Sequence, residues 1–540
     1  MTEEHVAPAV AEPVRSVTEP PALAFADAEG AKAWTNTLPF ASVAQLYATV
    51  HGQLRALAAA QFTPRERATI AEVLREQVAL LHTELARRYA GKPQPAVDRD
   101  LDAADQAITL WKALWTQYSA CLKPLLEGDP ELAGVKAKLL QRGLYVGKEL
   151  IVVHGLARRT VPPEVWQELH AYYRLAEMLD CAVTAVSDDL IPRGVGISCY
   201  STYSHALLLA LADPCGLSVR QIELVDRWLA MWARKVFPYA RQRESEGPVL
   251  VVDLDARTGA ALVFGAPASP PPTMRFGYPA KLSTSVRGRL KRLQTGANPA
   301  ELQLGQDCAI DQCVTLLGYL DAHWYLPPRR EPPAPPTPME LCGGGLAAAY
   351  FRVGGRTFER EEAVGRVYNQ KAPHLQSLDA ITHYDRGREE AERAWPWERW
   401  QGDCTRRDVV LRRVGDGAHR WQLDQLVVAR DEGRLRAGYL TRVELGADGE
   451  LSVSLRLWSA PPRCLALRPL SASLTEEPSM PVLHLAEAPD DKPSLCLPPR
   501  SFSPGRLLRS IDGGPERRFR LTRLLQRGAD FERVAFEESN

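Results

Sequence analysis

The 540-residue sequence lacks several features that would assign it to a specialised class. Its longest apolar stretches, such as Ala206–Ala212, are far too short to cross a bilayer. The first residues, Met1–Leu23, hold no basic segment followed by an apolar one, so no signal peptide is indicated. Lys plus Arg and Asp plus Glu both number 66, so the charge favours neither nucleic acid nor an anionic membrane. We therefore expect a cytoplasmic protein without membrane insertion and without a nucleic-acid partner.

Metal-binding and disulfide patterns are also missing. The ten cysteines are scattered without a Cys-x2-Cys pair, and the closest two are Cys308 and Cys313. The eleven histidines form no His-Glu-x2-His or His-x3-His pair. These absences predict reduced, mostly buried thiols, no metal site and no cofactor.

Amphipathic helices dominate the first half of the sequence. The clearest start is at Thr63, where a Thr N-cap, a Pro at the first helical position and a nearby Glu are typical of a first turn. A second helix begins near Pro162 and carries its aromatic and apolar residues on one stripe, as core packing requires. We predict an all-α N-terminal domain over residues 39–240, after a disordered lead-in over residues 1–38.

The segment 241–326 predicts a β-hairpin followed by helices. Two apolar runs, 248–254 and 260–264, flank a polar turn that contains Gly259. Seven prolines then fall within the twelve residues 327–338, and such a stretch can form neither a helix nor a sheet ladder. We predict that this stretch is a linker.

The last region, residues 339–540, changes its hydrophobic period. Apolar and polar residues alternate over 451–457, as in a half-buried strand. Similar short runs at 425–430, 438–444 and 464–468 are separated by glycine-containing turns. This pattern predicts antiparallel strands that close into a small barrel. The expected fold class is α+β and multi-domain, with an all-α N-terminal bundle and a small C-terminal antiparallel β-barrel.

No catalytic constellation stands out. Asp253 and Asp255 end an apolar strand, as the nucleophile and acid of haloacid dehalogenase-type phosphatases do, but the turn at Gly259 favours a hairpin. The hydroxyl-rich run 201–205 lacks the Gly-x-Ser-x-Gly pattern, and the glycines at 343–345 lack the Gly-Lys-Ser or Gly-Lys-Thr of a P-loop. We therefore predict no catalytic residue and expect that the protein is not an enzyme.

Arginine is abundant and lysine is scarce. The chain holds 54 Arg against 12 Lys, and only Lys492 lies beyond Lys371. A GC-rich genome would produce this bias. Planar guanidinium forks also suit phosphate or carboxylate binding in the last third of the chain, so both explanations stay open.

Four stretches, 290–308, 340–358, 425–439 and 520–525, resemble proteobacterial proteins that end in an atypical PilZ domain, and the likeness extends into the helical half. PilZ domains are small β-barrels that bind cyclic di-GMP and pass the signal to motility, pilus or secretion machinery. The resemblance implies a bacterial signalling protein with a PilZ-like barrel and cyclic di-GMP as a possible ligand. It also implies a protein partner, which we expect the helical N-terminal domain to bind.

The binding signature of PilZ domains is only partly present. Members that bind the dinucleotide use Arg-x3-Arg before the barrel and Asp/Asn-x-Ser-x2-Gly on its first strands, and the second motif is absent here. About five Arg-x3-Arg pairs are expected by chance at this arginine content. The pairs noted are Arg352/Arg356, Arg430/Arg434 and Arg523/Arg527.

Position relative to the barrel selects four candidate ligand-binding residues. Arg329 and Arg330 lie in the Pro-rich linker, and Arg406 and Arg407 lie where a first strand is plausible. We predict these four as phosphate contacts in a degenerate PilZ-like site. Two other functions stay open: a nucleotide-blind interaction scaffold and, more remotely, a phosphatase that uses Asp253.

Overall fold

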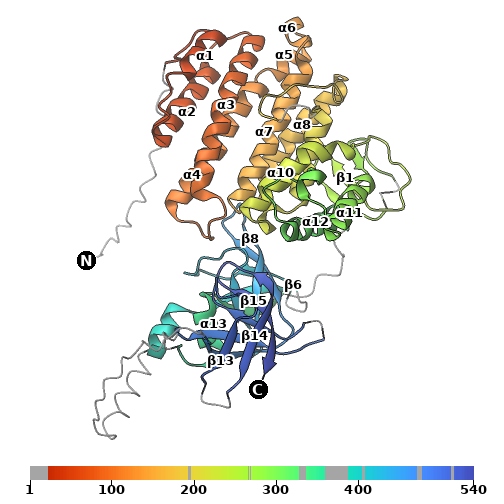
Figure 1. Cartoon of the computed structure of the whole chain (residues 1–540). Helices are drawn as coiled ribbons and strands as arrows, with labels where there is room; N and C mark the ends of the chain where they lie inside the picture. Colours follow the sequence, from red (N-terminus) through yellow and green to blue (C-terminus); the bar gives the residue numbers. More distant parts are fainter. Residues whose placement is uncertain are drawn as a thin grey trace, which may run out of the picture.

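A helical part and a β-rich part make up the chain, and Figure 1 shows the helices above the β-rich part. The structure is a computed structural model, which describes residues 22–540 except 192–195, 266, 268, 327–335, 359–386, 404–407, 471–476, 490, 513–515 and 540. The predicted α+β class, with a helical N-terminal region and C-terminal β-barrel structure, is confirmed.

The helical part begins with a bundle of α-helices and two short 3-10 turns. Thr63 caps α3 as predicted, because its hydroxyl accepts the Glu66 N–H at 3.2 Å. The bounds are α1 (Ala28–Thr35), α2 (Val43–Ala59), α3 (Pro64–Tyr89), α4 (Asp98–Ser119), α5 (Leu122–Leu126), α6 (Pro130–Ala133), α7 (Lys136–Leu156), α8 (Pro163–Met178), α9 (Cys199–Leu211), η1 (Pro214–Gly216), α10 (Val219–Trp232) and η2 (Ala233–Lys235).

The lead-in predicted over residues 1–38 is wrong at its end, because α1 lies within it. Asp27 caps this helix by accepting the Gly30 N–H at 2.7 Å, and Ala31 is fully buried. A side-chain cap and a buried face are enough to order this short helix against the bundle.

The segment 241–326 shares one hydrophobic core with the bundle, and this core extends from Phe25 to Trp324. The predicted hairpin is confirmed, because β1 and β2 pair antiparallel, with β3 on the other side of β1. No helix follows β1, so the segment does not have the strand–loop–helix form that the phosphatase hypothesis requires. The elements are β1 (Val249–Asp253), β2 (Ala261–Val263), β3 (Met274–Gly277), α11 (Ala280–Gln294), η3 (Pro299–Leu302) and α12 (Ile310–Tyr325).

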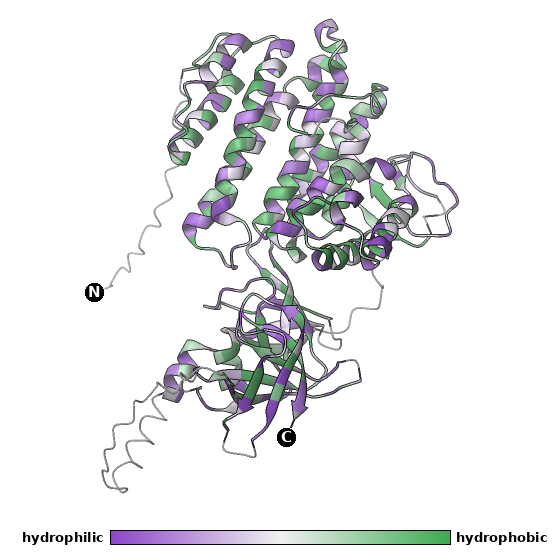
Figure 2. Cartoon of the chain, in the orientation of Figure 1, coloured by the Kyte–Doolittle hydropathy of each residue, from purple (hydrophilic) through white to green (hydrophobic). Residues whose placement is uncertain are grey.

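Helix α7 lies at the centre of the bundle. Every residue from Leu139 to Leu156 is buried, whereas neighbouring helices keep one hydrophilic face, as the two-toned ribbons of Figure 2 show. Three glycines allow this close packing: a Cβ at Gly143 would overlap Tyr172, one at Gly147 would overlap Leu169, and one at Gly155 would overlap Pro214. Helix α8 and the η1 turn therefore lie directly against the α7 backbone.

The first barrel is closed by antiparallel strands in the order β4-β5-β6-β9-β8-β7. The alternation predicted over 451–457 is confirmed, with Leu451, Val453, Leu455 and Leu457 buried inside the barrel. Helix α13 lies outside it and packs between the two barrels. The bounds are β4 (Thr337–Cys342), α13 (Gly345–Gly354), β5 (Glu398–Asp403), β6 (Asp408–Arg413), β7 (Leu426–Asp431), β8 (Arg434–Leu445) and β9 (Leu451–Leu457).

A second closed barrel follows, where the sequence led us to expect a single barrel and a strand-rich tail. The run at 464–468 is a strand as predicted, but it belongs to this second barrel, because β10 pairs with β11 and β13. Alternation identifies strands, but it does not specify which strands pair. The order is β10-β11-β12-β15-β14-β13, with β10 (Pro462–Pro469), β11 (Met480–Leu485), β12 (Ser494–Leu497), β13 (Leu507–Ser510), β14 (Arg518–Arg527) and β15 (Glu532–Ser539).

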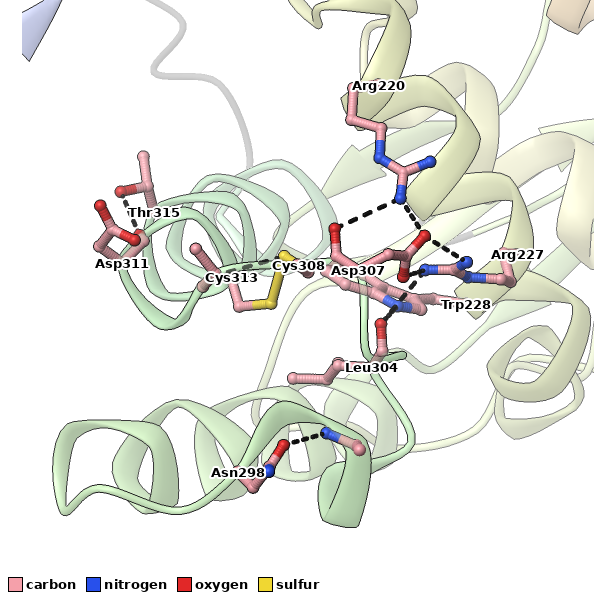
Figure 3. Close-up of a disulfide and its surroundings, with 12 residues drawn as sticks. Arg220, Arg227, Trp228, Asn298, Leu304, Asp307, Cys308, Asp311, Cys313 and Thr315 are labelled. Atoms are coloured by element: carbon pink, nitrogen blue, oxygen red, sulfur yellow. Dashed lines mark hydrogen bonds and ion pairs between the residues drawn. A yellow bond between two sulfur atoms is a disulfide. The ribbon is translucent and has the colours of Figure 1, made fainter.

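The linker predicted over 327–338 lies outside the described residues up to 335, and Thr337 and Pro338 belong to β4. The expectation of reduced cysteines is wrong for one pair. Cys308, in the loop after η3, and Cys313, in the first turn of α12, form a disulfide, shown in Figure 3. The chain turns into α12 between them and brings the two Cα atoms to 6.1 Å, which is within bridging range. The other cysteines that the structure describes are free, and most are buried.

Backbone hydrogen bonds join the bundle to the first barrel. The backbone N–H of Gln94 donates to the Trp421 carbonyl and the N–H of Trp421 donates to the Gln94 carbonyl, both at 2.7 Å. The Leu445 N–H donates to the Arg158 carbonyl at 2.8 Å. Arg442 of the barrel also forms an ion pair with Asp213 of the bundle. The Nε of Arg442 lies 3.0 Å from each of the two carboxylate oxygens of Asp213. Because α7 ends at Leu156, its C-terminal end leads directly into this contact.

Among the helices that the structure describes, none has both the length and the apolarity needed to cross a bilayer.

The close packing of α7 predicts a position-specific effect of adding one methyl group. Gly143→Ala should lower the free energy of unfolding by about 1–3 kcal/mol, because the new Cβ overlaps Tyr172 in a packed core. Gly288→Ala in α11 is the control, since nothing lies within 4 Å of its Cβ and alanine favours a helix. Denaturant unfolding measures both variants, and equal effects of the two would contradict the packing argument.

Candidate functional site

Arginine side chains converge on one side of the first barrel. A pocket of about 370 Å³ opens there between the end of α13, a short helix at residues 387–394, and the turn from β7 to β8. This volume is near the lower end of the range for small-ligand sites. Its lining residues are Phe351, Arg352, Gly355, Arg388, Glu392, Trp397, Arg430, Gly433 and Leu435.

Arg352 forms the buried wall of this pocket, with only 6% of its side chain exposed. Its Nη1 donates to Glu392 Oε2 at 2.7 Å, and its Nε donates to the carbonyl oxygen of Trp395 at 3.0 Å. Its guanidinium also lies 5.1 Å from the ring centroid of Trp397. Its Nη2 also donates to the Trp395 carbonyl, so all three guanidinium nitrogens are engaged. Arg352 therefore holds the wall in place and leaves ligand binding to its neighbours.

Arg430 and Arg388 form the accessible part of the pocket. The guanidinium of Arg430 lies 4.6 Å from the Trp397 centroid and pairs with Glu340 at 2.5 Å, while 39% of its side chain remains exposed. Arg388 is exposed on the helix at 387–394. With Arg352, three guanidinium groups meet two carboxylates, those of Glu340 and Glu392, which leaves the pocket positive.

A second hollow adjoins this pocket along the same short helix. It has a volume of about 570 Å³ and is lined by Arg388, Glu389, Glu392 and Arg393, two of which also line the first pocket. A ligand larger than the first pocket could extend along this helix. Guanidinium forks bind phosphate oxygens, and aromatic rings and guanidinium planes stack on nucleobases. The arrangement can therefore bind a nucleotide carrying more than one phosphate or base.

The four arginines predicted from the sequence, Arg329, Arg330, Arg406 and Arg407, all lie outside the residues that the structure describes. They stay a prediction. The residues that do converge were only partly signalled by the sequence. Arg352 and Arg430 each begin an Arg-x3-Arg pair, but the partners Arg356 and Arg434 do not line the pocket.

The glycines at 343–345 provide a close backbone approach beside this site. Gly344 and Gly345 have φ values of +114° and +70°, and a Cβ at Gly343 would overlap the His419 ring. These glycines turn the chain from β4 into α13. Those glycines thus position the helix that carries Arg352.

A second cluster of charged side chains lies inside the helical bundle. Lys148 on α7 is 4% exposed, and its Nζ lies 2.5 Å from Glu149 Oε1 and 3.1 Å from Asp226 Oδ1. Burial alone would raise the pKa of the Asp226 carboxyl, but Lys148 and His205 outweigh it and hold that pKa below its ordinary value. The Asp226 carboxylate is therefore ionised beside the ammonium group.

No described group of three or more His, Cys, Asp or Glu side chains could hold a metal ion.

Two family models match the chain. Residues 29–238 match the model described as "Cyclic-di-GMP receptor FimW, N-terminal domain", and residues 465–539 match "FimW C-terminal beta-barrel domain". The second match covers almost all of the second barrel. A search of curated proteins and a search of solved structures gave no match. The two matches lie in the family's own domain order and cover just over half of the chain. The chain therefore belongs to this family of cyclic-di-GMP receptors.

The buried ion cluster predicts a large difference between two lysines. Lys148→Met should lower the free energy of unfolding by about 3–5 kcal/mol, because it leaves the buried Glu149 carboxylate and the half-buried Asp226 carboxylate without their ammonium partner. Lys112→Met is the control, since Lys112 is 45% exposed and lies 3.7 Å from Glu164, and surface pairs contribute about 0–1 kcal/mol. Denaturant midpoints of both variants test this, and similar losses would contradict it.

Proposed function

We propose that this chain is a bacterial signalling receptor, not an enzyme, that binds cyclic di-GMP through the arginine pocket of its first barrel. The observation that carries the proposal is the convergence of Arg352, Arg388 and Arg430 around Trp397 in a positive pocket. Cyclic di-GMP carries two phosphates and two guanines, so it needs cations together with stacking surfaces. Membership of a cyclic-di-GMP receptor family supports the same ligand.

We propose further that the first barrel, β4 to β9, is the PilZ-like domain predicted from the sequence. Three features support this assignment: it is a small closed antiparallel barrel, it carries the arginine pocket on its side, and the second barrel is the one that matches the C-terminal family model. In this proposal the phosphates are bound by Arg388 and Arg430, and a guanine stacks on Trp397 or on a guanidinium plane.

The charges of the two candidate pockets favour the pocket of the first barrel over the bundle as the binding site for cyclic di-GMP. The pocket of the first barrel holds three arginines against two carboxylates. In the bundle, Lys148 already pairs with two carboxylates, those of Glu149 and Asp226. A dianionic ligand is attracted to the first site and repelled by the second. This difference in charge supports a ligand site in the barrel.

The receptor acts on a protein partner that belongs to motility or surface-behaviour machinery. The helical N-terminal domain binds this partner. Two contacts support a connection between ligand and output. Helix α13 lies beside the arginine pocket and packs between both barrels, and the first barrel is joined to the bundle through Trp421 and Leu445. A ligand that orders the pocket can thus act on both neighbouring domains. We expect the receptor to act in the cytoplasm.

Titration of the full-length chain with cyclic di-GMP tests this function. The unaltered chain should bind at micromolar concentrations or below. Arg388→Ala and Arg430→Ala should each weaken binding about tenfold or more, because each removes a charge-assisted contact worth about 1.5–3 kcal/mol. Arg434→Ala is the matched control, since it is an exposed arginine on the same hairpin that does not line the pocket.

Two other outcomes decide between the competing functions. If Arg406→Ala/Arg407→Ala or Arg329→Ala/Arg330→Ala weakens binding while Arg388→Ala and Arg430→Ala do not, the site is the one predicted from the sequence. If the unaltered chain shows no binding heat at tens of micromolar ligand, the nucleotide-blind scaffold replaces the receptor. The same partners would then be captured with and without cyclic di-GMP.

A further inference from the structure

The helical bundle contains a cavity that the proposed receptor function does not use. Its volume is about 610 Å³, within the range of sites for small organic molecules. It lies among α7, α9, α10 and the segments on either side of α9 and after η3. One part of its wall is apolar and comes from Leu190, Ile191, Ile197, Ala230 and Met231.

The inner end of this cavity is acidic. Glu149 and Asp226 both line it, and Lys148 is the ammonium group that they share. Asp226 is the carboxylate that faces the cavity most openly, with 31% of its side chain exposed against 11% for Glu149. Arg227 does not balance this excess, because Arg227 and its neighbour Arg220 are already matched by two other carboxylates. Asp307 pairs with both arginines, and Glu223 pairs with Arg220 at 2.9 Å. The fixed charges thus leave one carboxylate in surplus.

A histidine at this end contacts the same carboxylate. His205 lines the cavity and is 8% exposed, and its Nε2 lies 2.9 Å from Asp226 Oδ1. Lys148 Nζ is also nearer to this oxygen than to Asp226 Oδ2, at 3.1 Å against 3.4 Å. Asp226 Oδ2 is therefore the oxygen with hydrogen-bonding capacity available to a ligand in the cavity.

The mouth of the cavity is held in a fixed shape. Gln303, Gly305 and Gln306 line it, and the segment that carries them is anchored on both sides. Arg220 and Arg227 bind the Asp307 carboxylate, and the Trp228 indole N–H donates to the Leu304 carbonyl at 3.0 Å, as Figure 3 shows. The Cys308–Cys313 disulfide comes immediately after this segment in the chain. A mouth that is already ordered loses little entropy on binding.

We propose that this cavity is a second binding site, for a small organic cation with an ammonium or guanidinium group on an apolar body. The charged nitrogen pairs with Asp226 and Glu149 at the inner end. The apolar body packs against Ile191, Ile197 and Met231. This site is independent of the barrel pocket, which has the opposite charge and would not bind such a ligand.

Three probes with one indole body and different charges test the proposal on the full-length chain. They are tryptamine, a cation; tryptophol, a neutral alcohol; and indole-3-propionate, an anion. Saturation-transfer NMR should show binding in the order amine, alcohol, acid, with the amine at least about tenfold tighter than the acid, which corresponds to one favourable charge contact. Equal binding of the amine and the acid would overturn the proposal, as would no transfer to tryptamine at millimolar concentration.

Two variants locate the site. Asp226→Asn leaves Lys148 and Glu149 as a balanced pair, so the chain should fold, and tryptamine binding should weaken about tenfold while tryptophol binding persists. Met231→Trp fills the cavity without a change of charge and should abolish binding of both probes. Ala79→Trp is the control, because Ala79 lines only the neighbouring cavity, which shares Glu149 and Asp226 with this one. Retained tryptamine binding in Met231→Trp would overturn the assignment of the site.

Discussion

The burial of α7 on every side from Leu139 to Leu156 is the constraint on which the rest of the helical structure depends. A helix buried on every side must have neighbours that supply both apolar contacts and partners for its charged residues. Gly143, Gly147 and Gly155 let these neighbours approach closely. Arg142 lies inside and binds Glu72 and the fully buried Asp188, so the same helix ties α3 to the segment before α9. The core and the charged cluster therefore form together.

The same helix connects the two proposed sites. Lys148 and Glu149 of α7 form the inner end of the cavity in the bundle. Two turns later α7 ends at Leu156, and the next residues pair with Leu445 of the first barrel. A change at the cavity and a change at the barrel would thus act on one rigid element. This arrangement provides a physical route by which the two ligands could influence each other.

Much of the architecture could be predicted from the sequence because local chemistry determines it. Thr63 caps α3, the hairpin forms around the turn at Gly259, and the alternation at 451–457 marks a barrel strand. Features that depend on distant contacts were missed. The second barrel required knowledge of which strands pair, and the bridge between Cys308 and Cys313 required the turn that brings them together.

The candidate site was less predictable than the fold. Arg352, Arg388 and Arg430 are separated by many residues, and nothing in their spacing distinguishes them from the other arginines of the chain. Only the packing of α13 against β7, with Trp397 between the guanidinium groups, brings them to one pocket. A site of this kind consists of contacts between distant segments, so motif spacing alone could not reveal it.

Hydrogen–deuterium exchange of the full-length chain, with and without cyclic di-GMP, tests the central claim most directly. A ligand in the arginine pocket should slow exchange in α13, in the helix at residues 387–394 and in the turn from β7 to β8. Slowed exchange confined to α7, α9 and α10, or no change anywhere in the chain, would contradict the assignment of the receptor site to the first barrel.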